Sequence, residues 1–197
     1  MRLDRIKAYL IDLLVIFIFY TLINALVPQS DALKRYKAAE RELHENYIEQ
    51  KVSFNEYIDN YEIIYYNISA ESKVNNILYL LSVLVYFVVL PYLLNGQTLG
   101  LFLNKLRIEK FTDGKLHIHN YLIRNIVIVG LGYTIFNTLL IYFVNEKIYY
   151  KVLLVVSFIQ ILLLILSWIT VLLKKVNRGL HEIFSNTEMV SLRNKKN

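Results

Sequence analysis

Asp12 is the residue whose type and position most clearly predict chemistry, because it places a carboxylate inside an apolar run. The nineteen residues 9–27 are apolar or weakly polar except for Asp12 and Asn24. A carboxylate in a membrane helix costs about 2.5–3.5 kcal/mol on the insertion scale, so it should face the protein interior and meet a partner. Such a group can carry a proton or a cation across the membrane, or it can hold a structural polar cluster together.

Arg5 and Arg124 are the cations that could meet this carboxylate. Arg5, Ala8 and Asp12 are spaced by three and four residues, which puts them on one helix face, with Ala8 leaving room for a neighbouring helix. The step from Arg5 to Asp12 is about 10.5 Å of helix rise, too long for an easy direct ion pair. Arg124 begins a later apolar run at a similar membrane depth, and a buried guanidinium prefers a fixed carboxylate. We therefore expect Arg124 to meet Asp12, the alternative being an anchor to lipid head groups.

Two other groups of residues could hold a ligand. His117 and His119 would share one face of a strand, as a two-histidine metal site requires, but no third ligand stands at a motif spacing. A solvated strand face is the better interpretation, and no metal is expected. The segment GQTLG at 96–100 could offer backbone NH groups to a phosphate, but its spacing matches neither a P-loop nor a dinucleotide fingerprint. We expect Gly96, Thr98 and Gly100 to turn the chain at the membrane interface.

No arrangement of residues predicts an enzyme. The chain contains no cysteine, which excludes disulfides, thiolate metal sites and a cysteine nucleophile. No Ser/His/Asp set, metal cluster or carboxylate pair stands at catalytic spacing, so we expect a non-catalytic protein without a cofactor. The net charge of +6 does not predict nucleic-acid binding, because the basic residues cluster beside apolar runs.

The elements that must position these residues are membrane helices. With 56% hydrophobic residues among 197, the chain has too little polar surface for a water-soluble domain. Four runs are long enough to span a bilayer: 9–27, 74–104, 125–145 and 152–173, with Pro91 and Asn95-Gly96 ending the second helix near Leu94. A cleaved signal peptide is disfavoured, because the first run exceeds the usual ~7–15 apolar residues and contains Asp12.

The distribution of Lys and Arg predicts the orientation. Three precede the first helix, five lie within 105–124 and six follow from 174, against two between the third and fourth helices. Both termini should therefore be cytoplasmic, in a multi-pass protein of the bacterial cytoplasmic membrane. Residues 28–73 hold six basic residues and nine acidic ones, and their net charge of −3 fits the outside.

Residues 28–73 predict an extracytoplasmic helical hairpin. Its second half carries apolar residues at helical spacing. These are Phe54, Tyr57, Ile58, Tyr61, Ile64, Tyr65 and Ile68. Ser53 and Glu56 have the spacing of a capping box, which places the turn near Val52. Two interpretations of the stripe stay open: it packs within the hairpin and on the membrane surface, or Phe54, Tyr57, Tyr61 and Tyr65 dock a partner protein.

Two cytoplasmic segments complete the single domain of residues 1–197. In 95–121, a tight-turn signal at Thr112-Asp113-Gly114 between alternating flanks predicts a small β-hairpin. Residues 174–197 predict an amphipathic tail that folds back under the bundle, with Gly179 as a helix stop. The fold class is therefore an all-α membrane protein with four transmembrane helices, an extracytoplasmic helical hairpin and a small cytoplasmic β-hairpin.

Several of these motifs occur together in one known family. RIKAYLID, NGQTLG, the Asp-Gly hairpin, LIRN and NRGLHEIFSNTEMV follow one another in an order that resembles the RDD family of bacterial membrane proteins. The resemblance implies that the family's arginine is Arg5, its first aspartate Asp12, its glycine element Gly96, Thr98 and Gly100, and its following arginine Arg124. The second aspartate of the family is here Glu182, and Leu101 stands where a Lys or Arg is common.

The resemblance does not select one activity, because members are associated with sodium/proton exchange or with accessory and regulatory roles. We favour an accessory, regulatory or assembly subunit of the bilayer, whose outer hairpin contacts a membrane or extracytoplasmic protein. Arg5, Asp12, Arg124 and Glu182 then form a structural polar cluster. The alternative is a small cation/proton exchanger or solute transporter with Asp12 as its carrier. A lipid-handling role and a homo-oligomer stay open.

Overall fold

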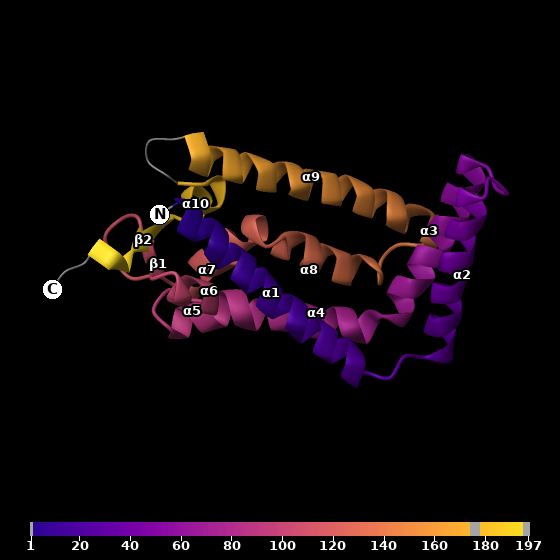
Figure 1. The fold of residues 1–197 in the computed structure, drawn as a ribbon, viewed down its shortest axis with the longest axis horizontal. Coiled ribbons are helices and arrows are strands. Elements are labelled where there is room, and N and C mark those ends of the chain that lie inside the picture. The colour runs from indigo at the N-terminus through magenta and orange to yellow at the C-terminus, as the bar shows by residue number, and fades with distance from the viewer. Residues whose placement is uncertain (1, 174–177, 195–197) are drawn as a thin grey trace.

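A computed structural model describes residues 2–173 and 178–194, and most of these residues are helical. The long helices lie roughly side by side, and a helical hairpin crosses one end of them (Figure 1). This hairpin consists of α2 (Asp31–Ile48) and α3 (Phe54–Glu71). At the opposite end, α10 (Leu180–Phe184) and the two strands lie beside the start of α1 (Arg2–Leu26). The arrangement therefore brings the first and last described segments of the chain together.

Within the described residues, three helices are long and apolar enough to cross a membrane. They are α1 (Arg2–Leu26), the helix Lys73–Leu93 and α9 (Glu146–Leu173). The second consists of α4 (Lys73–Leu84), a π-helical turn η1 (Val85–Val89) and α5 (Leu90–Leu93). It ends where Pro91 and the Asn-Gly pair predicted.

The third predicted span is not one straight helix. It is divided into α7 (Ile118–Ile128) and α8 (Leu131–Leu140), which meet at 82° and reach spanning length only as a pair. Gly130 lies at the break with φ +70°, a conformation that glycine adopts without steric cost. The last carbonyls of α7 accept hydrogen bonds from side chains of other helices: Val127 from Gln160 and Ile128 from Tyr9. These bonds replace the helical ones that the break removes.

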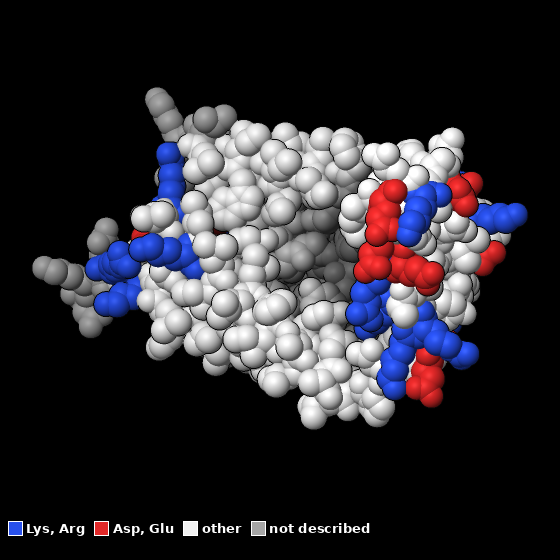
Figure 2. Space-filling view, turned by 45° about the vertical axis from the view of Figure 1, so that its right-hand side comes forward, with Lys and Arg blue, Asp and Glu red and all other residues white. Residues whose placement is uncertain are grey.

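The surface of the long helices is apolar. Phe17 of α1 and Phe158 of α9 are each about two-thirds exposed, as side chains that face lipid should be. Figure 2 shows charged residues gathered at the two ends of the molecule, with an uncharged surface between them. This distribution fits a protein that spans a membrane.

The helical hairpin of residues 28–73 is present as α2 (Asp31–Ile48) and α3 (Phe54–Glu71). Each helix begins at a serine whose hydroxyl accepts a backbone NH, Ser30 from Leu33 and Ser53 from Glu56. The cap at Ser53 confirms the predicted start of the second helix. α3 also contacts the start of α9, where Lys151 pairs with Glu62 at 3.4 Å.

The predicted β-hairpin within 95–121 is wrong, because its first strand pairs elsewhere. β1 (Leu106–Lys110) pairs antiparallel with β2 (Thr187–Ser191) of the tail, with Ile108 opposite Met189. The expected second strand is instead the start of α7, since the amide of His117 donates to Asn120 Oδ1 and caps that helix. A local turn signal could not reveal a partner strand about 80 positions later in the sequence.

The tail folds back onto the bundle, as predicted, but Gly179 is not a helix stop. It is the N-cap of the short helix α10 (Leu180–Phe184), which leads into β2 and a final turn η2 (Leu192–Asn194). Residues 174–177 and 195–197, which belong to the predicted amphipathic tail, lie outside the described residues. The tail thus supplies a helix and a strand to the end of the molecule where α1 begins.

Candidate functional site

Asp12 lies in a cage of neutral hydrogen-bond donors and is only 5% exposed. Its Oδ1 accepts from the Tyr86 hydroxyl at 2.5 Å and from the Gly100 amide at 2.8 Å, and its Oδ2 accepts from Thr98 Oγ1 at 2.7 Å. The prediction that Arg124 pairs with Asp12 is therefore wrong. The expected turn at 96–100 brings the short helix α6 (Leu99–Leu103) against α1. Thr98 and Gly100 of this segment then donate hydrogen bonds to the carboxylate in place of Arg124.

The close approach of α6 to α1 depends on two small residues. Ala8 is almost fully buried, as its position on the Arg5–Asp12 face predicted. A Cβ added at Gly100 would overlap the Ala8 carbonyl oxygen and would lie 2.8 Å from the Asp12 carboxyl carbon. Only glycine fits here, because backbone and carboxylate both occupy the space that a side chain would need.

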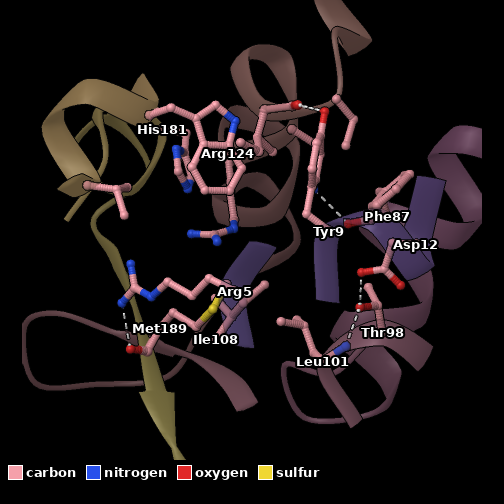
Figure 3. A pocket seen from close by; sticks show the side chains of 15 residues that line it. Arg5, Tyr9, Asp12, Phe87, Thr98, Leu101, Ile108, Arg124, His181 and Met189 are labelled. Atoms are coloured by element: carbon pink, nitrogen blue, oxygen red, sulfur yellow. Dashed lines mark hydrogen bonds between the residues drawn. The ribbon is translucent and has the colours of Figure 1, made fainter. Parts of the chain in front are cut away.

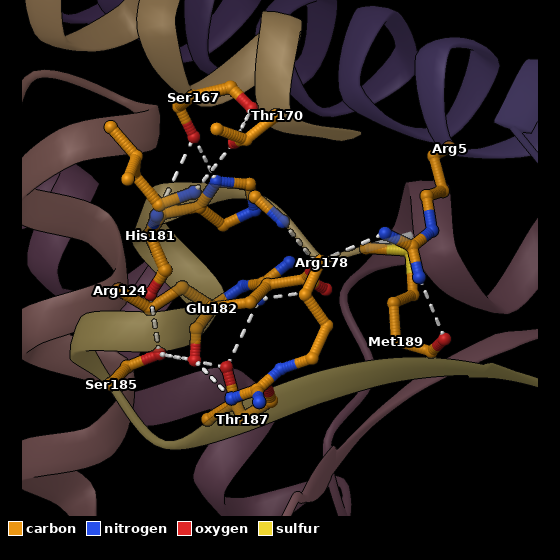
Figure 4. A network of polar contacts seen from close by, with 12 residues as sticks. Arg5, Arg124, Ser167, Thr170, Arg178, His181, Glu182, Ser185, Thr187 and Met189 are labelled. Atoms are coloured by element: carbon orange, nitrogen blue, oxygen red, sulfur yellow. Dashed lines mark hydrogen bonds and ion pairs between the residues drawn. The ribbon is translucent and has the colours of Figure 1, made fainter. Parts of the chain in front are cut away.

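The two arginines meet at Glu182, which is completely buried in α10. Its Oε2 lies 3.0 Å from Arg5 Nη1 and accepts the Gly179 amide at 2.9 Å, and its Oε1 lies 3.4 Å from Arg124 Nη1 (Figure 4). Arg124 Nη1 also donates to Thr187 Oγ1 at 3.2 Å. The four predicted cluster residues thus divide into two sites, Asp12 with α6 and Glu182 with both arginines.

His181 extends the Glu182 site toward α9. Its Nδ1 lies 2.5 Å from Ser167 Oγ, and the imidazole is 4% exposed. Burial lowers the pKa of His181 well below its usual 6.5, and the positive charges of Arg124 and Arg5 lower it further. The imidazole is therefore neutral at physiological pH. Sequence analysis missed this residue, because it stands in a short tail segment without a recognisable ligand spacing.

A cavity lies between the two sites, with an empty volume of about 570 Å³ including its mouth. Arg5, Arg124 and His181 line one side, and Asp12 and Thr98 line the other (Figure 3). Further lining residues are Tyr9, Phe87, Leu101, Ile128 and Trp168. Tyr9 and Trp168 touch edge to face with their ring centroids 5.6 Å apart. The wall of the cavity is therefore built from α1, η1, α6, β1, α7, α9 and the tail, and it carries charged groups on a mostly apolar surface.

The aromatic stripe of α3 is largely used within the molecule. Tyr57 stacks on Tyr61, which continues to Tyr65, with ring centroids 5.7 and 5.8 Å apart. Tyr61 and Tyr65 also contact Tyr150 of α9. Phe54, at the tip of the hairpin, remains 61% exposed. Phe54 also contacts Tyr47, with ring centroids 6.3 Å apart, so all four residues predicted as a partner surface make internal contacts.

The two histidines considered for a metal site lie at the start of α7, not on a strand. The rings of His117 and His119 stack with centroids 5.5 Å apart and are exposed. In the part of the chain that the structure describes, no three His, Cys, Asp or Glu residues come together in a way that could hold a metal ion. Their local environment is that of a solvated helix start.

Fold and site together define a helical membrane protein with two buried carboxylate sites at one end. The RDD family model matches residues 2–186, so the chain belongs to the RDD family, a family of membrane proteins. No curated protein and no solved structure matches the chain. Of the residues that the resemblance implies, Arg5, Asp12, Thr98 and Arg124 line the cavity. Gly100 and Glu182 are buried against these residues, and Gly96 packs against Ile108 of β1.

Proposed function

We propose that this protein is a non-catalytic membrane component that serves as an accessory, regulatory or assembly subunit. One observation carries the proposal: groups of the protein itself occupy both buried carboxylates. Asp12 accepts three hydrogen bonds, and Glu182 binds two guanidiniums and a backbone amide. Carboxylates that are held in this way join elements of the fold, because releasing them would leave buried charges unpaired.

The proposed orientation is multi-pass in the bacterial cytoplasmic membrane, with both termini in the cytoplasm. Basic residues predominate at the end of the molecule on the left of Figure 2, whereas the hairpin at the other end carries both signs of charge. This asymmetry is what the positive-inside rule expects of a cytoplasmic end. The hairpin then lies across the outer surface of the membrane.

The partner surface that we propose is the tip of this hairpin, where α2 ends and α3 begins. Ile48, at the end of α2, is 65% exposed, and Phe54, at the start of α3, is 61% exposed, so each side of the turn presents a large apolar side chain. Exposed apolar groups of this kind commonly anchor a protein partner. A membrane or extracytoplasmic protein would contact them from the side of the bundle.

A cation/proton exchanger or solute transporter is the second candidate, because α7 and α8 form a broken span beside the cavity that Asp12 lines. Transporters bind ions at such breaks. Arg5 and Arg124 line the same cavity and would repel a cation, which ranks this candidate below the first.

Purification of the full chain in a mild detergent tests the proposal. A second protein should accompany it in stoichiometric amount, and Phe54→Asp should lose that protein while its thermal midpoint stays unchanged. Asn55→Asp is the matched control, since it adds the same charge beside Phe54 without removing the ring. Sodium or proton flux in proteoliposomes that Asp12→Asn abolishes would instead support the transporter.

A further inference from the structure

The cavity that Tyr9 and Trp168 line has no role in the proposed function. Its walls are mostly apolar, with Phe87, Leu101 and Ile128 among them. The space that a water-sized sphere can enter is about 60 Å³, enough for one small polar head group, and ligand sites combine apolar walls with a few placed polar groups. The polar groups here decide what the cavity could bind.

Arg124 directs unused donors into this space. It is 4% exposed, and both of its contacts within the described residues, to Glu182 Oε1 and Thr187 Oγ1, come from Nη1. Its Nε and Nη2 therefore remain for another acceptor, and Figure 3 shows the guanidinium facing the interior of the cavity. A guanidinium offers five donors in a rigid fork that matches a carboxylate or phosphate. A buried guanidinium with two nitrogens that donate to no protein group is therefore suited to bind an anion.

The charges around the cavity favour an anion as well. Arg5 and Arg124 both contact the single carboxylate of Glu182, so two guanidiniums lie on this side of the cavity. Arg178 adds a third guanidinium next to the cluster, where its Nη2 donates to the Glu182 carbonyl at 3.0 Å. Asp12 lies on the opposite wall with both oxygens bonded to α6 and Tyr86, so it does not neutralise Arg124 directly.

We propose that this cavity binds an amphiphilic anion, that is, one carboxylate or phosphate group attached to an apolar chain. The head group accepts from Arg124 Nε and Nη2, and the first part of the chain packs on the apolar walls. An inorganic ion would satisfy the arginine and leave those walls uncovered, whereas an apolar molecule would leave the arginine unpaired. A fatty acid and an anionic lipid share the required chemistry.

Thermal unfolding of the full chain in a neutral maltoside detergent tests this site. Dodecanoate and dodecyl phosphate should raise the midpoint by roughly 5–10 °C at a hundredfold excess over the dissociation constant. Dodecanol and inorganic phosphate should leave it unchanged. An equal rise with dodecanol, or with inorganic phosphate, would overturn the proposal, as would no rise with either amphiphile. Vesicles of phosphatidylglycerol that compete with dodecanoate would identify a lipid head group as the natural source, and no competition would indicate a free fatty acid.

Two variants locate the binding. Arg124→Gln should abolish the rise, while Arg107→Gln, the same substitution outside the cavity, should retain it. Because Arg124→Gln removes a buried charge partner and could prevent folding, Val129→Phe provides a second test, since it fills the cavity from its wall. Its control is Val155→Phe, at a position of α9 that is 60% exposed. A full rise in Val129→Phe would place the ligand elsewhere and overturn the assignment.

Discussion

Arg5 and Glu182 are separated by 177 positions in the chain, yet Arg5 Nη1 donates to Glu182 Oε2 over 3.0 Å. The bond joins the first helix to the tail, and Arg5 Nη2 strengthens the junction by donating to the Met189 carbonyl at 2.9 Å. Arg124 brings α7 to the same carboxylate. One buried side chain therefore holds three parts of the fold together.

Glu182→Gln should lower the free energy of unfolding by about 3–5 kcal/mol, because it removes the buried carboxylate that two buried guanidiniums contact. The measurement is thermal or denaturant unfolding in detergent, with Glu56→Gln on the exposed start of α3 as the control. Adding Arg124→Gln to Glu182→Gln should recover part of the loss, since one stranded charge is then gone. Simple addition of the two losses would show that the pair does not interact.

Asp12→Asn should cost about 1.5–3 kcal/mol, because the amide keeps one acceptor oxygen and places an NH2 against donors. The loss should couple to Tyr86→Phe, with an interaction energy of roughly 0.5–3 kcal/mol in a double-mutant cycle. In a double-mutant cycle of Asp12→Asn with Arg124→Gln, the two losses of stability should be nearly additive. A large coupling to Arg124 and none to Tyr86 would contradict the observed partners of this carboxylate.

Gly100→Ala should prevent α6 from docking on α1, since the new Cβ would meet the Ala8 carbonyl and the Asp12 carboxyl group. We expect a loss of more than about 3 kcal/mol or no folded protein in detergent. Gly132→Ala, inside α8 and against the Ile126 side chain, should change stability by less than about 1 kcal/mol. The two variants are compared by their chromatographic profiles and melting midpoints. Equal losses of stability would count against a specific role for Gly100.

Acid should destabilise the protein through His181. The folded pKa of this imidazole lies well below the unfolded value of about 6.5, so the unfolded chain binds the extra proton first. Its contribution to stability is present above pH 6.5 and is lost as the pH falls below it, by up to about 1.4 kcal/mol per unit. His181→Gln should reduce the fall in melting midpoint between pH 7.5 and 5.5. His44→Gln, at an exposed position, should leave this fall unchanged. An unchanged slope in His181→Gln would assign the acid sensitivity to other groups.

Topology can be tested with single cysteines, because the chain has none of its own. A cysteine at Glu49, in the hairpin turn, should react with an impermeant maleimide in intact cells. A cysteine at Asp113, in the exposed loop between β1 and α7, should react only after lysis. Labelling of the Asp113 position alone in intact cells would reverse the proposed orientation.

Helical spacing was sufficient to predict that Arg5, Ala8 and Asp12 are buried on one face, because a helix repeats at fixed intervals. Spacing could not supply the partners. Tyr86 is one aromatic residue in a long apolar run, and nothing local marks its hydroxyl as the donor to Asp12. The strand partner of β1 lies in the tail, which only the folded chain brings near. Local rules therefore predicted the elements, and the pairings between distant elements required the structure.

The tail that carries Glu182 follows α9 in the chain, so it is synthesised after Arg5 and Arg124, and this order constrains assembly. Arg5 and Arg124 are therefore translated before the Glu182 carboxylate with which both pair. α10 and β2 complete this end only after translation of the last helix. A chain that stops after α9 would contain both arginines without the Glu182 carboxylate, so the three-way junction at this end could not form.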